Sequence, residues 1–304
     1  MSILGVGALQ IAGQRSGNIE LVEQQVRSAC TRYPWLSLIT LSELAIHGSG
    51  LRYAEPAGGA TERRMQALAA ELGIWLVPGS LYEQRNGLIY NTSPVINPAG
   101  EVVARYDKMC PFLPYATGVE PGQTYVVFDV PDVGRIGIII CYDLWFPEII
   151  RNLACMGAEA ILVPTMTNSI DRDVELAMAR AAAASNQLYM IDVNSGGDQG
   201  LGRSVVYGPG GECQHEGGSG GELIAVELDF SYVRRVRDRG WNGLGQVLKS
   251  FRDMPASFPY HEGPESRQQA LAHLGSLTVP TAPDRDGASP ASRPKAGENR
   301  FSAV

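Results

Sequence analysis

The chain has 304 residues, of which 44% are hydrophobic and 19% are charged, with a formal net charge of -7 at pH 7 and an isoelectric point of about 5.2. This composition is typical of a globular protein with room for one large α/β domain or two small ones. The acidic balance argues against nucleic acids and anionic membranes as partners, because both favour basic surfaces, and no apolar run approaches the roughly 20 residues that span a bilayer.

The first third of the chain alternates between strand and helix patterns. Ile19, Val22, Val26 and Ala29 recur at helical spacing, which predicts an amphipathic helix between two buried strands. A second helix ends at Gly73, a residue type that is common just after helices. The predicted strands are residues 5–11, 36–41 and 74–80, and the predicted helices are residues 18–33 and 61–72.

The rest of the chain mixes hairpins with further α/β units. Residues 88–97 and 101–108 predict one hairpin, and a second turns at the glycine-rich residues 208–211. Because hairpins add antiparallel strands to parallel α/β units, the pattern favours a layered α/β sandwich with mixed sheets over a doubly wound open sheet. Further strands are predicted at residues 135–141, 158–164, 188–194 and 222–230, and further helices at 147–156 and 171–187.

The composition changes near the C-terminus. After about residue 264 the sequence is rich in Gly, Pro, Ala and Ser and has few side chains to bury. We therefore predict one domain over residues 1–262 and a tail over residues 263–304 that is disordered or contacts a partner.

The cysteines and the N-terminus indicate a cellular location. The five cysteines are odd in number and lack the spacing of disulfide frameworks or metal sites. The apolar N-terminal segment has no cationic start, so it predicts a strand rather than a signal peptide. We therefore expect reduced thiols and a cytoplasmic protein.

Three predicted strand ends carry charged or nucleophilic side chains, namely Glu43, Lys108 and Cys141. Function in α/β folds concentrates where strands end and loops begin. A thiol attacks well only as a thiolate, so a nearby carboxylate would take its proton, while an ammonium would stabilise the negative charge on an attacked carbonyl. The backbone N–H of Tyr142 is a second candidate donor to that oxyanion.

Each of these residues also has a purely structural interpretation. A cysteine at a strand end is often a small buried hydrophobic residue. Glu43 also fits an exposed loop, and Lys108 fits a surface pair with Asp107. The individual residues leave both interpretations open.

The combination resembles the nitrilase, or carbon–nitrogen hydrolase, superfamily. A glutamate is followed by a lysine about 65 residues later and a cysteine about 33 residues further on, in the segments LSELAIHG, RYDKMCPF and GIIICYDLWFPE. The later segments GAEAILVPT and ARAAAASNQLYMIDVN also match the family. The likeness covers about residues 3–252.

This resemblance implies a four-layer αββα sandwich and an amidase acting on non-peptide carbon–nitrogen bonds through a cysteine thioester, with no metal or cofactor. It implies that Glu43 is the general base, Cys141 the nucleophile and Lys108 the group that stabilises the transition state. It also suggests a homodimer or larger homo-oligomer, in which the segment after Asp229 reaches the partner.

The chain departs from the family pattern at two places. Amidases of the family often carry a second glutamate about eight residues after the lysine, where this chain has Ala116. Glu120 is the candidate replacement, and it reaches the site only if its loop is rerouted. Ser42 replaces the usual proline before the first glutamate. We expect the missing glutamate to affect the rate or the type of reaction.

The sequence around the nucleophile favours an amide substrate with a small, partly apolar acyl group. Cys-Tyr-Asp resembles the amidase and ω-amidase branches, whereas nitrilases generally carry Cys-Trp-Glu, and LWFPE also resembles carbamoyl-amide hydrolases. The residues predicted to line the pocket are Tyr115, Tyr142, Trp145, Thr165, Met166 and Thr167.

Three functions remain open at this point. The first is hydrolysis of a small carboxamide to acid and ammonia, with N-carbamoyl amide or nitrile hydrolysis as variants. The second is a binding or regulatory protein on a degenerate scaffold, which the alanine at position 116 suggests. The third is an enzyme whose thioester passes its acyl group to a nucleophile other than water. The complete Glu–Lys–Cys set favours the first.

Overall fold

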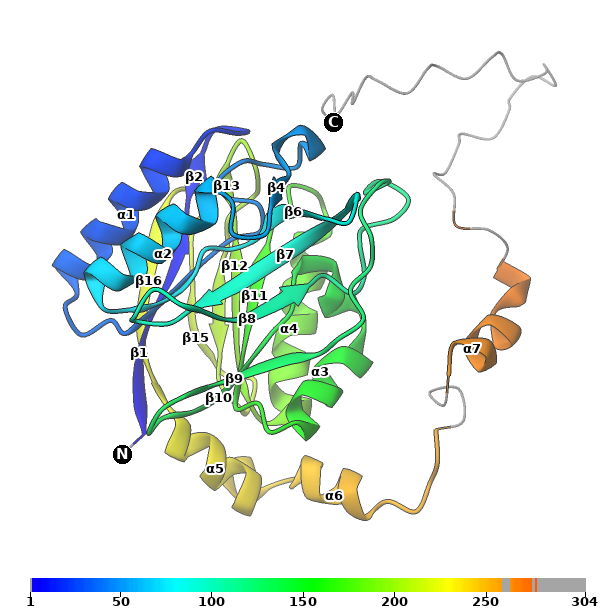
Figure 1. Ribbon diagram of the computed structural model, residues 1–304. Helices are drawn as coiled ribbons and strands as arrows, with labels where there is room; N and C mark the ends of the chain where they lie inside the picture. Colours follow the sequence, from blue (N-terminus) through cyan, green and yellow to red (C-terminus); the bar gives the residue numbers. More distant parts are fainter. Residues whose placement is uncertain (1, 259–262, 275–276, 278–304) are drawn as a thin grey trace, which may run out of the picture.

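Four helices present their apolar stripes to two β-sheets in the computed structural model, which describes residues 2–258, 263–274 and 277 of the chain. They are α1 (Ile19–Arg32), α2 (Ala60–Leu72), α3 (Pro147–Cys155) and α4 (Arg172–Asn186). The first two cover the outer face of one sheet, and the other two cover the outer face of the second sheet (Figure 1). The predicted αββα sandwich is therefore confirmed.

Both sheets mix parallel and antiparallel strands, as predicted. The spatial order of the first sheet is β16 (Glu222–Asp229), β1 (Ile3–Gln10), β3 (Leu38–Leu41), β5 (Trp75–Val77), β7 (Leu88–Ile96), β6 (Leu81–Arg85) and β4 (Glu55–Pro56), with β8 (Val102–Asp107) paired to β7. The order of the second sheet is β15 (Cys213–Glu216), β14 (Val205–Tyr207), β12 (Tyr189–Asn194), β11 (Ala160–Thr165), β10 (Gly134–Ile138) and β9 (Val126–Val130). A short parallel ladder joins β2 (Ala12–Gly13) to β13 (Gly196–Gly197).

The apolar core lies in three layers, one between the sheets and one under each helix pair. Because successive side chains of a strand point to opposite faces, Ile39 and Ile161 pack under helices while their neighbours face the other sheet. Burial on both faces explains why these strands form continuous apolar runs in the sequence. The layer between the sheets includes Val6, Leu38, Val95, Ile138, Leu162 and Ile191.

Most predicted elements are present, with differences of a few residues at their ends. The first predicted hairpin forms as antiparallel β7 and β8, and the glycine-rich turn joins β14 to β15. The sequence analysis did not predict β6 and β9, nor the two-residue strands β2, β4 and β13. β6 is largely polar, and it depends on pairing with β7 and on the burial of Tyr82 and Glu83, which only the tertiary structure provides.

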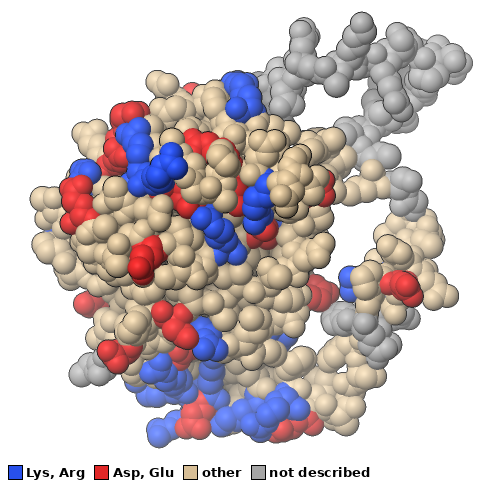
Figure 2. All heavy atoms as spheres, in the orientation of Figure 1, with Lys and Arg blue, Asp and Glu red and all other residues tan. Residues whose placement is uncertain are grey.

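The chain leaves the sandwich through α5 (Phe230–Arg239) and α6 (Val247–Asp253), where basic side chains gather with carboxylates among them (Figure 2). Arg234 binds Glu159 at 2.7 Å, which ties α5 to the sandwich. Within the described residues, no helix is long and apolar enough to cross a membrane. The short 3₁₀ helices are η1 (Leu51–Tyr53), η2 (Cys141–Trp145), η3 (Trp241–Gly243) and η5 (Ala272–Leu274).

The predicted tail is described only in part. It contains α7 (Pro264–Ala270) and η5, whereas residues 275–276 and 278–304 lie outside the described residues. The domain boundary near residue 262 and the character of the tail therefore stay predictions.

Candidate active site

The two sheets bring the three predicted strand-end residues to one place. Glu43 follows β3 and Lys108 follows β8 in the first sheet, while Cys141 lies beyond β10 in the second. The Glu43 backbone N–H donates to the Thr165 carbonyl at the end of β11, with an N···O distance of 3.2 Å, which joins the two sheets at this point. Glu43 and Lys108 are close enough for their charges to act on the Cys141 thiol.

Glu43 and Lys108 form a buried ion pair. Lys108 Nζ lies 2.7 Å from Glu43 Oε1, and both side chains are 5% exposed. Asn91 Nδ2 donates to the same carboxylate oxygen at 2.8 Å. Asp107 binds Arg85 instead, at 2.6 Å. The interpretation of Glu43 as an exposed loop acid and of Lys108 as a surface partner of Asp107 is therefore wrong.

Burial and charge act in opposite directions on Lys108. Burial alone would lower the pKa of its ammonium group, but the negative charge of Glu43, with a smaller contribution from Asp143, raises that pKa above its usual value. Lys108 therefore remains a fixed positive charge, which is suited to stabilising negative charge on a carbonyl oxygen.

Cys141 occupies a strained turn between a strand and a helix. Its φ of +48° lies in the left-handed region that residues other than glycine rarely adopt, and it directly follows the extended Ile140. Burial raises the pKa of its thiol well above the usual value, Glu43 raises it further, and Lys108 opposes both. The thiol is therefore protonated at neutral pH and needs a base at the moment of attack.

Asp143 fixes the position of this turn. Its Oδ2 accepts hydrogen bonds from the Ile140 backbone N–H at 2.9 Å and from the Tyr106 hydroxyl at 2.7 Å. Its Oδ1 accepts from the Cys110 backbone N–H at 2.7 Å, in the segment that follows β8. Burial raises the pKa of Asp143 to about 6, although a nearby lysine and these hydrogen bonds oppose the shift. Asp143 therefore fastens the nucleophile turn to the segment that carries the lysine.

Three of the predicted pocket residues belong to one aromatic cluster with Phe112. Tyr115 stacks on Phe112 with ring centroids 5.2 Å apart, and Phe112 meets Tyr142 edge-on at 5.0 Å. Tyr142 in turn lies 6.0 Å from Trp145. These rings form a continuous aromatic cluster, and its member Tyr142 directly follows the cysteine in the chain. The role of the Tyr142 N–H as an oxyanion donor stays a prediction.

The other three predicted pocket residues differ in their relation to the nucleophile. The Thr165 hydroxyl donates to the Val163 carbonyl at 3.2 Å, so its side chain turns back to its own strand. The Met166 backbone N–H lies close enough to the Cys141 sulfur to lower the pKa of the thiol. The Thr167 hydroxyl oxygen lies 3.9 Å from Cys141 Sγ. Met166 and Thr167 therefore adjoin the nucleophile directly.

The two departures from the family pattern have clear local environments. Ala116 packs against a small apolar cluster that includes Leu44. Ser42 is fully buried, and its hydroxyl oxygen accepts a hydrogen bond from the Ser195 hydroxyl at 2.8 Å, a contact that a proline side chain could not make.

The candidate replacement carboxylate, Glu120, points to the face of the first sheet opposite to that of Asn91. It forms a parallel bridge with Tyr90. Bridged residues point to the same face of a sheet and successive residues of a strand point to opposite faces. Asn91 points to Glu43, so Tyr90 and Glu120 point away from it. This orientation does not favour Glu120 as the replacement carboxylate.

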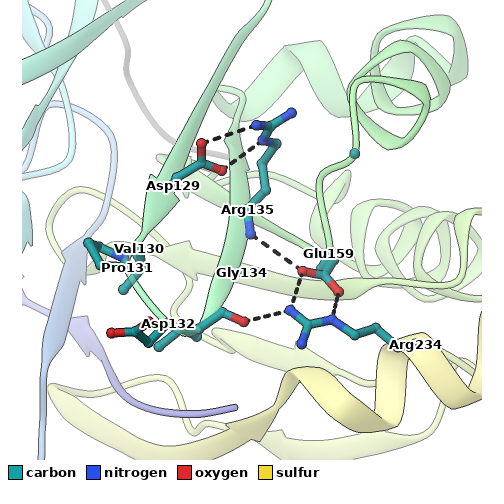
Figure 3. A pocket seen from close by; sticks show the side chains of 10 residues that line it. Asp129, Val130, Pro131, Asp132, Gly134, Arg135, Glu159 and Arg234 are labelled. Atoms are coloured by element: carbon teal, nitrogen blue, oxygen red, sulfur yellow. Dashed lines mark hydrogen bonds and ion pairs between the residues drawn. The ribbon is translucent and has the colours of Figure 1, made fainter.

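A surface hollow of about 540 Å³ lies at the opposite ends of β10 and β11 (Figure 3). Its charged side chains are largely bound to one another, Arg135 to Asp129 and Arg234 to Glu159. The residues that line it include no thiol, hydroxyl or imidazole side chain. Among the described residues, no group of three or more His, Cys, Asp or Glu side chains is arranged to hold a metal ion.

Three residues of the site have weaker sequence signals. Asn91 and Asp143 are polar residues inside largely apolar segments, which is a sign of a buried partner. Glu175 lies in the acidic first turn of α4, which the sequence explains by the helix dipole. In the structure Glu175 is buried and its carboxylate accepts from the Thr167 hydroxyl at 2.9 Å, so the dipole alone does not account for it.

The chain matches the carbon–nitrogen hydrolase family over residues 4–238. It is 28% identical over 202 residues to omega-amidase NIT2 of Xenopus tropicalis, covering 62% of this chain and 73% of that protein. Its structure is similar to that of Saccharomyces cerevisiae Nit3, a member of branch 10 of the nitrilase superfamily, with a TM-score of 0.72 and 25% identity over 78% of this chain and 94% of that one. It is also similar to a variant of an amidase from Nesterenkonia sp. AN1 with the acetamide moiety of fluoroacetamide added covalently at the active-site cysteine, with a TM-score of 0.68 and 26% identity over 77% of this chain and 94% of that one.

Asp143→Asn should destabilise the fold by about 1–3 kcal/mol. An amide has one acceptor oxygen, so the Ile140 or the Cys110 backbone N–H loses its buried partner. Urea unfolding followed by circular dichroism measures the change. Asp129→Asn, at an exposed carboxylate bound to Arg135, should leave stability nearly unchanged. Equal stability of Asp143→Asn and wild type would contradict the role given to Asp143.

Proposed function

The chain belongs to the carbon–nitrogen hydrolase family, and from this premise we propose that it hydrolyses a small carboxamide to the carboxylic acid and ammonia through a thioester on Cys141. The observation that carries the proposal is the buried Glu43–Lys108 ion pair, with 2.7 Å between its charged atoms, beside a cysteine in a strained turn. In this arrangement a base and a fixed positive charge adjoin a protonated thiol. Relatives of the chain are amidases, which supports amide hydrolysis by this protein.

In the first half of the proposed reaction, Glu43 takes the thiol proton as the electron pair of Cys141 Sγ forms a bond to the amide carbonyl carbon. The carbonyl oxygen becomes an oxyanion, and the Lys108 ammonium stabilises its charge. The proton on Glu43 then passes to the amide nitrogen. The C–N bond breaks, ammonia leaves, and the acyl group remains on sulfur as a thioester.

In the second half, a water molecule gives a proton to Glu43 as its oxygen attacks the thioester carbon. The C–S bond breaks, and the departing thiolate takes the proton back from Glu43. The carboxylic acid leaves and the resting thiol is restored. A protonated thiol at rest is consistent with this cycle, because the same carboxylate serves as base and acid in both halves.

Two observations favour an amide with a partly apolar acyl group. The relatives include an omega-amidase and an amidase with an acetamide moiety on its active-site cysteine. The aromatic cluster of Phe112, Tyr115, Tyr142 and Trp145, which includes the residue after Cys141, offers an apolar surface. Hydrolysis of N-carbamoyl amides or nitriles would use the same nucleophile and is distinguished by the substrate that releases ammonia.

We also propose that the protein acts in the cytoplasm as a homo-oligomer. All five cysteines are free thiols, which suits a reducing compartment. The segment after Asp229 forms α5 and α6 at the edge of the sandwich and is the candidate contact with a second copy.

Cys141→Ala should abolish ammonia release and leave the fold intact, since both side chains are small. Cys141→Ser should be nearly inactive, because a hydroxyl is far harder to ionise than a thiol. The assay is ammonia release from short amides, carbamoyl amines and nitriles, with circular dichroism as the control for folding. Turnover by either variant at the wild-type rate would exclude Cys141 as the nucleophile.

Lys108→Met should lower kcat by at least about 10²–10³ with a smaller change in KM, because an oxyanion is left without a preorganised positive charge. The matched control is Lys249→Met, at a lysine on α6 that binds Asp238 at 3.3 Å. Steady-state kinetics on the best amide from the screen measure both variants. A folded Lys108→Met enzyme with a normal kcat would show that Lys108 does not stabilise the transition state.

The acyl-enzyme should accumulate during turnover. If the family's second glutamate normally orients the hydrolytic water, Ala116 slows thioester hydrolysis more than thioester formation. Intact-protein mass spectrometry should then show a mass increase equal to the acyl group, absent in Cys141→Ala. Glu120→Gln should have little effect, since Glu120 points away from the site.

Three other outcomes of this experiment have distinct meanings. No adduct with any amide, carbamoyl amine or nitrile would favour a binding protein on the same scaffold. An adduct that is released faster by an added amine or thiol than by water would favour acyl transfer. Severe loss of activity in Glu120→Gln would contradict the orientation of that residue.

A further inference from the structure

A network of buried charged side chains adjoins the nucleophile through Thr167. Arg172 Nη1 lies 2.8 Å from Asp192 Oδ2 and 3.3 Å from Glu175 Oε2. Arg172 Nη2 donates to the Arg203 carbonyl at 2.8 Å. Arg172, Glu175 and Asp192 are 1%, 4% and 0% exposed, respectively. With both carboxylates ionised, the network carries an excess of one negative charge.

Stability alone does not explain this network. Arg172 Nε and Asp192 Oδ1 are buried without a hydrogen-bond partner among the described residues. Burying several charges is costly, and well-packed apolar residues are often as stabilising or more so. Its place next to the nucleophile points to a role in the chemistry instead.

Thr167 connects the charged network to the cysteine. Its backbone is fixed on both sides by Asn194, whose Oδ1 accepts from the Thr167 N–H at 2.8 Å and whose Nδ2 donates to the Thr167 carbonyl at 3.0 Å. Its hydroxyl donates to Glu175 Oε1 at 2.9 Å. A hydroxyl has one proton and an ionised carboxylate can only accept, so the lone pairs of the Thr167 oxygen face Cys141 Sγ at 3.9 Å.

This orientation favours one protonation state of the cysteine. A thiol can donate its S–H to the Thr167 oxygen, whereas a thiolate would face oxygen lone pairs. We propose that Glu175 is a positioning residue, whose buried negative charge and whose hydrogen bond from the Thr167 hydroxyl together keep Cys141 protonated until Glu43 takes its proton. The inference rests on the proposed function only in assigning the nucleophile to Cys141 and the base to Glu43.

The charged groups around the sulfur act in both directions. Glu43, from the segment after β3, and Glu175, from α4, raise the pKa of the Cys141 thiol in addition to burial. Lys108, from the segment after β8, and the Met166 backbone N–H lower it. Removal of the Glu175 charge should therefore make the thiolate easier to form.

The pH range of this effect follows from the environment of Glu175. Burial and the charge of Asp192 raise the pKa of the Glu175 carboxyl, while Arg172 and Thr167 lower it by smaller amounts. Glu175 therefore loses its charge at a higher pH than an ordinary glutamate. Its effect on Cys141 is present above that pH and disappears as the pH falls through it.

The test is the pH dependence of alkylation of Cys141 by iodoacetamide in the full chain without an amide present, with the adduct located by peptide mass spectrometry. Glu175→Gln keeps the shape and the acceptor for Thr167 but removes the charge. Its alkylation profile should move to lower pH by about one unit, which is about tenfold faster alkylation below the midpoint. The matched control is Glu159→Gln, at a buried carboxylate bound to Arg234 at the opposite end of β11, and its profile should match wild type.

A second pair of variants tests the Thr167 hydroxyl that links Glu175 to Cys141. Thr167→Val should move the profile in the same direction by a smaller amount, and Thr167→Ser, which keeps the hydroxyl, should restore most of the wild-type profile. A folded Glu175→Gln protein whose profile is unchanged, or moved to higher pH, overturns the inference. If that variant does not fold, identical profiles of Thr167→Val and Thr167→Ser overturn it instead.

Alkylation requires no turnover, so the two proposals fail separately. A shifted profile in a protein that releases no ammonia from any substrate would refute the proposed function and leave the effect of Glu175 on Cys141 standing. Normal turnover with an unshifted profile would do the reverse. A merely structural role of Glu175 would lower the unfolding temperature of Glu175→Gln without moving the profile.

Discussion

The buried ion pair between Glu43 and Lys108 is the interaction on which the rest of the site depends. Taking two charges out of water is costly, and the cost is recovered only with close contact and further hydrogen bonds. Here the charged atoms are 2.7 Å apart and Asn91 gives the same carboxylate oxygen a second donor. The two-sheet core makes this possible, because it buries Glu43, Asn91 and Lys108 together at β7 and the ends of β3 and β8.

The nucleophile is held by the opposite sheet, and its turn is kept in place by a single carboxylate. A residue with φ near +48° persists only where the surroundings determine its conformation. Asp143 provides this by binding the backbone on the N-terminal side of Cys141 and the segment beyond Lys108 at once. The attacking sulfur and the stabilising ammonium are thus positioned by the same buried side chain.

Two glutamates adjoin the cysteine in different environments, and this separates their roles. Glu43 is bound to Lys108 and Asn91 and is the candidate proton acceptor. Glu175 is bound to Arg172 and reaches the sulfur only through Thr167. The first arrangement places a base beside the thiol, while the second opposes early ionisation, so that the charge would appear on sulfur only as it attacks.

The sequence by itself determined the order of most strands and helices, because both faces of the central strands and one face of the helices that cover the sheets are apolar and their spacing is visible in the chain. It also singled out Glu43, Lys108 and Cys141, through their positions at strand ends and their likeness to a family. Only the tertiary structure decided which polar residues surround them. Asn91, Asp143 and Glu175 act through partners that come from distant segments. On β7, Asn91 faces Glu43, whereas Tyr90, one residue earlier, faces the other way together with its bridged partner Glu120. Such choices depend on pairing between strands and on burial, and neither is encoded in the local pattern of the residues concerned.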